Sequence, residues 1–434
     1  MIDANFLILF FIVSLLLTSF LILFYRGDIL QPSILFCGTM TFSAFMASIY
    51  AGKWSLPFSV DAFFLLTLAL FMFSLGDIFC TLKGFSKKSI QPLTEHKRYD
   101  MNNLVLIIIL FIMAVFVYST ARELYSLSLH FGNNDGYMGM IKSLRPAIEA
   151  QKIQLSRWVN YRQVFALSVA AVSVYAFLYN VIYSKAKIRD FKFLLPVIMY
   201  IPFTIMTTGR MAMMTFVIFF FILTAMLYQK RYIYSYQSKK RVVAFIIIIS
   251  IACVAFFLMM GNLTGKVSNQ NHTAPMILAH YAGLSLPAFD VAIHSFSVNT
   301  GDIGSTTLLG LYRILSRVGA DLPRVNIFLP FVHFNGIDTN VYTAEWRYFK
   351  DFGFWGMCAI VWLLGSVYSF MYNVIKYNIK SNCLFMILYA MIAFPLFLSS
   401  IDERFFLDLI GTPIIYDILL VWIMEKCILK VTDV

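Results

Sequence analysis

Long apolar runs restrict the fold of this chain more than any other feature. A helix needs about 20 predominantly apolar residues to cross a bilayer, and eleven runs approach or exceed that length. These runs are 5–25, 31–51, 60–82, 103–121, 163–184, 193–209, 211–229, 242–261, 352–375, 383–401 and 405–425. We therefore predict an all-α polytopic integral membrane protein, a single membrane domain over 1–434 with about 11 transmembrane helices (a range of about 10–12).

Composition supports the same class. The chain is 60% hydrophobic and 13% charged, whereas a soluble domain has about 45–50% apolar and about 25% charged residues. Such low charge also excludes disorder and coiled coil. The six cysteines lie within or at the ends of apolar runs, without a CxxC pair, so neither disulfides nor a metal site is expected. The run 5–25 lacks a preceding basic region, and we expect a retained helix rather than a signal peptide.

Arg210 separates two runs, 193–209 and 211–229. Together with the arginine they span 37 residues, nearly two bilayer crossings. The alternatives are a hairpin at Arg210 and one long broken helix. Thr207, Thr208 and Gly209 are residues that favour turns, so we prefer the hairpin.

Lys and Arg in short loops set the orientation of a membrane protein. Alternating the loops places 19 of the 34 basic residues inside and 3 in short outer loops, with the other 12 in the long loops 122–162 and 262–351. This predicts a periplasmic amino terminus, a cytoplasmic carboxyl terminus and two long periplasmic loops containing short interfacial helices. The segment 274–298 carries His280, Asp290 and His294, and we expect it to be re-entrant or interfacial. One missed span would reverse the first half.

The first long loop contains an amphipathic pattern over 141–158. Its apolar residues recur at helical spacing, with basic residues between them: Ile141, Leu144, Ile148, Leu155 and Trp158 on one face, and Lys142, Arg145, Lys152 and Arg157 beside it. One interpretation is a helix that rests in the headgroup plane. The other is that it frames a cavity for an anionic lipid.

The second long loop contains a short helix signal. Ser305 is a candidate cap for a helix over 306–318, which Gly319 would end. Arg313 and Arg317 lie four residues apart and share one face. Two guanidinium groups at this spacing suit a diphosphate. Snorkelling to lipid phosphates would satisfy the same spacing.

The densest polar string, 338–356, stands where the second loop meets the run from 352. Asp351 occupies an expected N-cap position. Before it come hydrogen-bonding and charged groups within eight residues, namely Asn340, Tyr342, Thr343, Glu345 and Arg347. Because sugar hydroxyls need both donors and acceptors, this density suits a glycan.

Two strings within this region, Asn340-Val-Tyr-Thr and Asp351-Phe-Gly-Phe-Trp-Gly, occur with an upstream Thr208-Gly-Arg210. In these strings and its architecture the chain resembles the Wzy-type O-antigen and oligosaccharide repeat-unit polymerases. The resemblance implies a GT-C-like glycosyltransferase that uses undecaprenyl-diphosphate-linked glycan at the periplasmic face. It carries over Arg210, Asn340, Tyr342, Asp351 and Gly353. Many members have both termini inside, which differs from our orientation.

The expected roles follow from charge and chemistry. Eight of the 12 basic residues in the long outer loops are Arg, whereas 14 of the 19 inner ones are Lys. Since arginine stays charged and is weakly hydrated, it suits diphosphate recognition. We expect Arg210, Arg313, Arg317 and Arg347 to bind diphosphate, Asn340, Tyr342 and Thr343 to bind sugar, and Glu345, then His280, with Asp351 as a further candidate, to act in catalysis. No cofactor is expected.

Partners and alternatives complete the prediction. We expect membrane lipid and a chain-length regulator protein as partners, and no nucleic acid. The alternative functions are an O-antigen ligase and a polysaccharide or lipid-linked glycan transporter without catalysis. A transporter would use intramembrane carboxylates as a proton relay, and Asp77, Asp408 and Asp417 should face the protein interior. The spans show few candidate partners for them.

Overall fold

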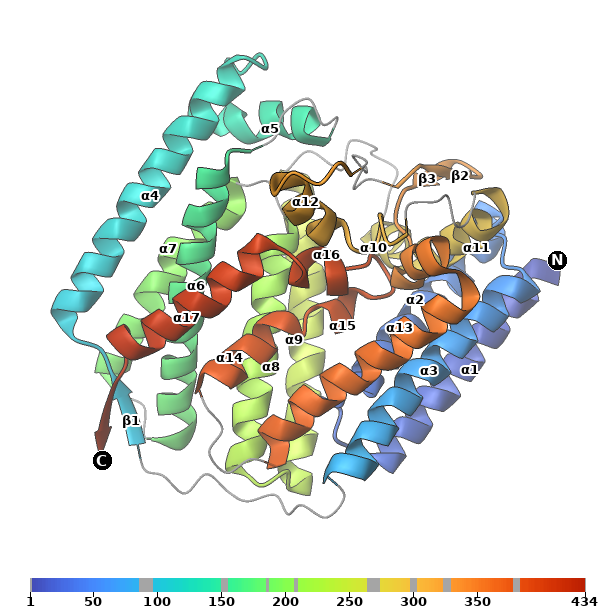
Figure 1. Ribbon diagram of the computed structural model, residues 1–434, viewed down its shortest axis with the longest axis horizontal. Coiled ribbons are helices and arrows are strands. Elements are labelled where there is room, and N and C mark those ends of the chain that lie inside the picture. Colours follow the sequence, from blue (N-terminus) through green and yellow to red (C-terminus); the bar gives the residue numbers. More distant parts are fainter. Residues whose placement is uncertain are drawn as a thin grey trace. The chain divides into compact units, whose positions relative to one another are not determined.

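The computed structural model describes residues 2–85, 97–149, 155–184, 187–206, 210–263, 274–296, 303–322, 329–377 and 383–433 (Figure 1). The first half contains α1 (Ile2–Phe24), α2 (Pro32–Trp54), α3 (Val60–Phe85), β1 (Lys97–Asp100), α4 (Asn103–Leu129), α5 (Gly136–Glu149), α6 (Arg157–Tyr183), the 3-10 helix η1 (Ile188–Phe193), α7 (Leu194–Met206) and α8 (Arg210–Arg231). The second half contains α9 (Tyr236–Leu263), α10 (Ala274–Gly283), α11 (Ser285–Ser295), α12 (Leu309–Arg317), β2 (Val332–Phe334), β3 (Ile337–Thr339), α13 (Ala344–Tyr377), α14 (Cys383–Ile392), α15 (Pro395–Leu398), α16 (Phe405–Leu409), α17 (Thr412–Ile428) and β4 (Lys430–Asp433).

Eight helical segments in the described part of the chain are long and apolar enough to cross a membrane. They are α1, α2, α3, α4, α6, α8, the α10–α11 pair and α13. The chain is thus an all-α polytopic membrane protein, as predicted, and seven of the eight segments coincide with predicted runs.

The other predicted runs do not each form one long described span. The run 193–209 is divided between η1 and the 13-residue α7, which is shorter than the roughly 20 residues of a straight crossing. The last two runs are interrupted between α14 and α15 and between α16 and α17. The run 242–261 lies in the 28-residue α9, where some side chains fall outside the described residues.

The segment 274–298, described through residue 296, agrees with the prediction of a re-entrant stretch. It forms α10 and α11, joined at Leu284, and its length and composition alone would suffice for a span. Met276 contacts Lys53 at the end of α2 and His294 contacts Asp61 at the start of α3, so both ends of the segment lie at the same end of these helices. Gly283, beside the junction, packs on Ala47 farther along α2. Asp290 is buried and accepts a hydrogen bond from the Ser59 hydroxyl, and His294 lies 3.4 Å from the Asp61 carboxylate. These partners explain how polar side chains are accommodated in an otherwise apolar segment.

The helices gather into two compact units, which interleave along the chain. Unit 1 comprises 1–91, 271–379 and 392–412, and unit 2 comprises 92–270, 380–391 and 413–434. In unit 1, α3 packs along α13 and α1 packs along α2 (Figure 1). A single membrane domain stays a prediction.

Two glycines allow α3 and α13 to approach closely. A Cβ on Gly76 would overlap the backbone carbonyl of Trp362, and a Cβ on Gly365 would overlap that of Phe73. Small residues at helix contacts permit this close approach in membrane proteins, where the association is driven by packing. Gly76 and Gly365 therefore account for the close contact between α3 and α13.

In unit 2, α7 and α8 form the hairpin predicted at Arg210. The rings of Tyr200 and Phe216 lie 5.0 Å apart, whereas 16 residues along one continuous helix would separate them by about 24 Å. The two helices therefore fold back on each other. The expected turn residues 207–209 lie outside the described residues.

The amphipathic pattern in the first long loop is also resolved in unit 2. Its described residues lie in α5, at 155–156 and at the start of α6, whereas Lys152 lies outside the described residues. Leu144 is buried against Leu124, Val159 and Met206. The apolar stripe thus packs on α4, α6 and α7, and its place in the headgroup plane stays a prediction. Trp158 is the exception, being 68% exposed.

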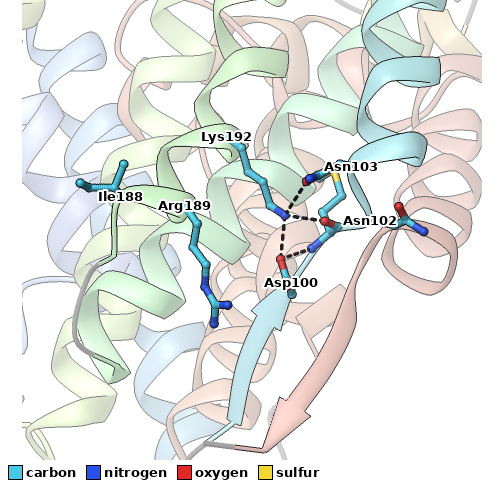
Figure 2. A pocket seen from close by; sticks show the side chains of 7 residues that line it. Asp100, Asn102, Asn103, Ile188, Arg189 and Lys192 are labelled. Carbon is cyan, nitrogen blue, oxygen red and sulfur yellow. Dashed lines mark hydrogen bonds and ion pairs between the residues drawn. The ribbon is translucent and has the colours of Figure 1, made fainter.

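One end of unit 2 contains a cavity of about 570 Å³ beside β1, which pairs antiparallel with β4. The Lys192 ammonium lies 2.8 Å from Asp100 and 3.2 Å from the Asn103 side-chain oxygen, and Figure 2 shows Arg189 pointing away from them. The ion pair helps to hold the pKa of Asp100 below its usual value, against the opposing effect of burial. Lys192 therefore joins η1 to the start of α4.

Candidate functional site

Helix α13 begins earlier than predicted. Its first residue is Ala344, whose amide donates to the Ser399 carbonyl at 2.8 Å. Gly353, with φ of 66° and ψ of −166°, interrupts the helical backbone nine residues later, a conformation available to glycine. Asp351 therefore lies within a short helical segment before this kink, and the prediction that it caps the helix from 352 is wrong.

Asp351 instead holds the chain that precedes α12. Its carboxylate accepts three hydrogen bonds, from the amides of Thr306 and Thr307 at 3.0 and 2.6 Å and from the Thr306 hydroxyl at 2.8 Å. Residues 303–307 form a turn, and these contacts hold it against α13. Helix α12 starts at Leu309, so the predicted Ser305 cap is also wrong.

Helix α12 lies against α16, within unit 1. A Cβ on Gly310 would overlap the carbonyl oxygen of Ile410, so the two backbones are in contact. Gly319, with φ of +100°, follows the helix end as predicted. Arg313 is exposed on α12, and the Arg317 side chain lies outside the described residues.

Glu345 is the most unusual group at this end of unit 1. Its side chain is 0% exposed, and neither carboxyl oxygen has a hydrogen-bond partner among the described residues. The nearby hydroxyl of Thr343 likewise makes no well-formed hydrogen bond. Buried polar groups are normally paired, and an unsatisfied carboxyl can mark a functional position.

A second buried carboxyl, Glu403, lies close to Glu345. It accepts hydrogen bonds from the Tyr348 hydroxyl at 2.9 Å and from the amides of Phe406 and Leu407 at 2.7 and 3.1 Å. Burial raises the pKa of Glu403 to about 7, against the lowering effect of these donors, and the neighbouring Asp402 charge adds to the rise. Glu403 therefore exchanges a proton near neutral pH.

Two arginines complete the group. Arg347 is buried, donates to the Thr306 carbonyl at 3.3 Å and lies 3.7 Å from Asp402. Arg404 lies 3.0 Å from the other Asp402 oxygen and 3.4 Å from Asp408. We call Glu345, Arg347, Asp402, Glu403 and Arg404 the Glu345 cluster. It combines buried carboxyls with guanidinium groups, one of which, on Arg404, is about one quarter exposed.

The predicted sugar-binding residues lie just before the cluster. Tyr342 is buried and donates to the Pro330 carbonyl at 2.8 Å, and burial raises the pKa of its phenol. This contact fixes the preceding loop. Thr343 is buried next to Glu345, and Asn340 is partly exposed. Residues 340–343 therefore lead directly into the Glu345 cluster within unit 1.

Two predicted residues belong to other parts of the fold. His280 lies in α10, which packs on α2, and its ring is 5.2 Å from that of Tyr281. It is not a member of the Glu345 cluster. Arg210 is the first residue of α8 in unit 2, and its side chain lies outside the described residues.

The sequence analysis did not identify the residues that contact the start of α13. Asp402, Glu403 and Arg404 are three consecutive charges between two apolar runs, which is a visible signal. The sequence pattern does not show that they approach Arg347 and Glu345, some 55 residues earlier, because the approach depends on how α15 and α16 pack. Thr306 and Thr307 were missed for the same reason.

Comparison with known proteins yields no match to a family model, a curated protein or a solved structure. Among the described residues, no group of three or more His, Cys, Asp and Glu side chains is arranged to hold a metal ion. Inference about function therefore depends on the residues of the chain itself.

Proposed function

We propose that this protein is a polymerase that joins undecaprenyl-diphosphate-linked oligosaccharide repeat units into O-antigen or a related surface polysaccharide. The single observation that carries the proposal is the buried Glu345 carboxyl, which has no hydrogen-bond partner in the described part of the chain and lies in a cluster that also contains Arg347 and Arg404. A glycosyl transfer from a diphosphate needs a proton acceptor and positive charge, and the cluster has both.

The transfer requires one bond to form and one to break. The acceptor sugar hydroxyl attacks the anomeric carbon of the donor glycan, and a glycosidic C–O bond forms. The bond between that carbon and the diphosphate oxygen breaks, so undecaprenyl diphosphate leaves with the electron pair. Glu345 in its ionised form takes the proton of the hydroxyl. No oxidant or nucleotide is consumed, because the donor is already activated.

Positive charge stabilises the departing diphosphate. Arg347, Arg404 and the exposed Arg313 of α12 supply guanidinium groups in unit 1, and Arg317 of the same unit is proposed to add to them. Guanidinium groups can donate two hydrogen bonds at once to phosphate oxygens. Glu345 is enclosed in the conformation described above, so the proposal includes an opening of the enclosing turns that admits the acceptor.

The resemblance of 340–343 and 351–356 to the Wzy-type polymerases supports the same reaction. With it the proposal includes a GT-C-like arrangement of about 11 spans, a bacterial inner-membrane location and a periplasmic cluster. Asn340, Thr343 and Tyr342 are proposed to line the glycan path, and a chain-length regulator is a proposed partner. His280 and Asp351 remain weaker candidates for the proton acceptor, since both Asp351 oxygens already accept hydrogen bonds.

The test uses purified protein in detergent, since transport needs two compartments and transfer does not. The substrate is the lipid-linked repeat unit extracted from a host strain in which this gene is deleted. We expect wild-type protein to produce a ladder of longer glycans, and Glu345→Gln to lower the rate roughly 10²- to 10⁴-fold through loss of the proton acceptor. Asp338→Asn, an exposed carboxyl in the same string, is the control and should retain activity.

Each other outcome has a defined meaning. A full ladder from Glu345→Gln protein would contradict the assigned role of Glu345. Absence of product from wild-type protein, together with uptake of the lipid-linked glycan by sealed vesicles, would favour the transporter. Product formed only when lipid A core is added as acceptor would favour the ligase.

A further inference from the structure

A second polar site lies at the other end of α13, within unit 1. It surrounds Asp77 of α3, which is 0% exposed. Polar side chains from three segments meet there: Gln31 and Ser33 at the start of α2, Thr81 of α3, and Ser369 and Asn373 of α13. Asp77 therefore faces the interior, as predicted, but the prediction that it would have few partners is wrong.

The contacts to Asp77 come from neutral donors. The Gln31 amide donates to one carboxylate oxygen at 2.7 Å, and the Ser33 backbone amide donates to the other at 3.0 Å. Asn373 donates to Thr81 at 2.9 Å and to Ser369 at 3.0 Å, which closes a ring of polar groups beside the carboxylate. No salt bridge to Asp77 occurs among the described residues.

A buried ion pair lies near Asp77 at this end of unit 1. Lys376 lies 2.6 Å from Asp28, which also accepts a hydrogen bond from Tyr372 at 2.8 Å. Asp77, by contrast, has no salt-bridge partner among the described residues when it is ionised. An uncompensated charge in a membrane interior is strongly unfavourable, so a positive species is needed.

Four buried oxygens of residues in this polar site make no well-formed hydrogen bond among the described residues. They are the Tyr25 hydroxyl and the Ser33 hydroxyl, which both interact with Asp77, the Gln31 side-chain carbonyl and the Asn373 side-chain carbonyl. A proton on Asp77 would neutralise the charge, but it would donate to only one of these oxygens. A cation attracts several oxygens at once.

We propose that Asp77 and these neighbouring oxygens form a binding site for a monovalent alkali cation, Na⁺ or K⁺. The single carboxylate and the predominance of neutral oxygens favour a monovalent over a divalent ion, whose sites usually include more carboxylates. The site is separate from the Glu345 cluster, so the proposal holds whether or not the protein is a glycosyltransferase.

The first experiment measures thermal unfolding of purified full-length protein in detergent. NaCl or KCl replaces choline chloride at constant ionic strength and pH. We expect the midpoint to rise by several degrees and to saturate with one of the two cations, because a ligand that binds only the folded protein stabilises it. Asp77→Asn should abolish the rise, whereas Asp61→Asn, an exposed carboxyl on the same helix, should keep it.

A direct measurement covers the case in which Asp77→Asn does not fold. Wild-type protein is equilibrated with ²²Na⁺, and unlabelled Na⁺ or K⁺ is added as competitor. Saturable binding displaced by either ion supports the site, and the better competitor identifies the cation. Absence of saturable binding, or a midpoint that depends on pH but on neither cation, would overturn the proposal in favour of a protonated Asp77.

Discussion

Asp351 fastens the turn before α12 to the first part of α13. Its two carboxylate oxygens accept three hydrogen bonds, two of them from backbone amides. Because amides of a buried turn need an acceptor, this side chain fixes the position of residues adjacent to the Glu345 cluster. At the scale of single residues, the site thus contains a carboxylate that positions the chain and a carboxyl, Glu345, that has no partner among the described residues.

Replacing Asp351 should destabilise the protein. Asp351→Ala leaves the amides of Thr306 and Thr307 without their acceptor, and we expect a loss of about 3 kcal/mol, since each unsatisfied buried group costs about 1–3 kcal/mol. Thermal unfolding in detergent measures the change as a lower midpoint. The exposed Asp338→Ala is the control, and an equal effect of both variants would contradict the assigned role.

Glu403 should make stability dependent on pH. Its pKa is raised from 4.5 to about 7 in the folded protein, so the folded state binds the proton more tightly than the unfolded state. The resulting stabilisation is fully present below pH 4.5, is lost as pH rises through about 7, and corresponds to about 3 kcal/mol.

The measurement compares unfolding midpoints between pH 5 and pH 8. Wild-type protein should lose more stability over this range than Glu403→Gln, which stays neutral. Glu123→Gln, a partly exposed carboxyl that pairs with Arg162, should keep the wild-type dependence. Identical curves for wild type and Glu403→Gln would contradict the assigned proton exchange.

At the scale of elements, the contact between α3 and α13 connects the two polar sites of unit 1. Gly76 and Gly365 each face a backbone carbonyl of the opposite helix. The same helix α13 carries Glu345 near its start and Asn373 near its end. Because a close-packed pair of helices cannot shift without losing many contacts, this contact should hold both sites in place.

A methyl group at this contact should force the helices apart. Gly365→Ala places a Cβ against the Phe73 carbonyl oxygen, and overpacking of this kind costs about 1–3 kcal/mol. The matched control is Gly38→Ala in α2, where a Cβ meets nothing within 4 Å. Unfolding midpoints should fall for the first variant and stay level or rise for the second. Equal behaviour would show that the close approach is unimportant.

At the scale of the whole molecule, contacts between loops agree with the predicted alternation of loops between the two faces of the membrane. In unit 1 the Asn335 amide donates to the Trp54 carbonyl at 3.3 Å, which joins two loops predicted outside. In unit 2 Lys192 contacts Asp100, which joins two loops predicted inside. Each unit therefore brings together loops that the basic-residue count assigns to the same face.

Cysteine labelling tests that orientation. In a cysteine-free variant, Asn335→Cys lies in the exposed β2–β3 turn and Gln237→Cys lies at the exposed start of α9. We expect a membrane-impermeant maleimide to label position 335 in intact spheroplasts and position 237 only after lysis. The reverse pattern would invert the proposed topology and exclude a periplasmic Glu345 cluster.

The sequence alone determined the membrane class, the positions of seven helices long and apolar enough to cross a membrane, and the hairpin at Arg210. These depend on the length, the apolar character and the turn residues of local segments. It also located the string 340–356, where α13 begins, because polar density stands out beside apolar runs.

Only the tertiary structure decided which surfaces are covered and which charges meet. The apolar stripe of α5 packs on protein, a contact that hydropathy alone does not predict, because lipid and protein interiors are equally apolar. Likewise, Asp351 meets Thr306 and Glu345 lies near Glu403 through the packing of distant segments. The sequence shows which chemical group each residue carries, whereas the packing of the helices decides which groups it contacts.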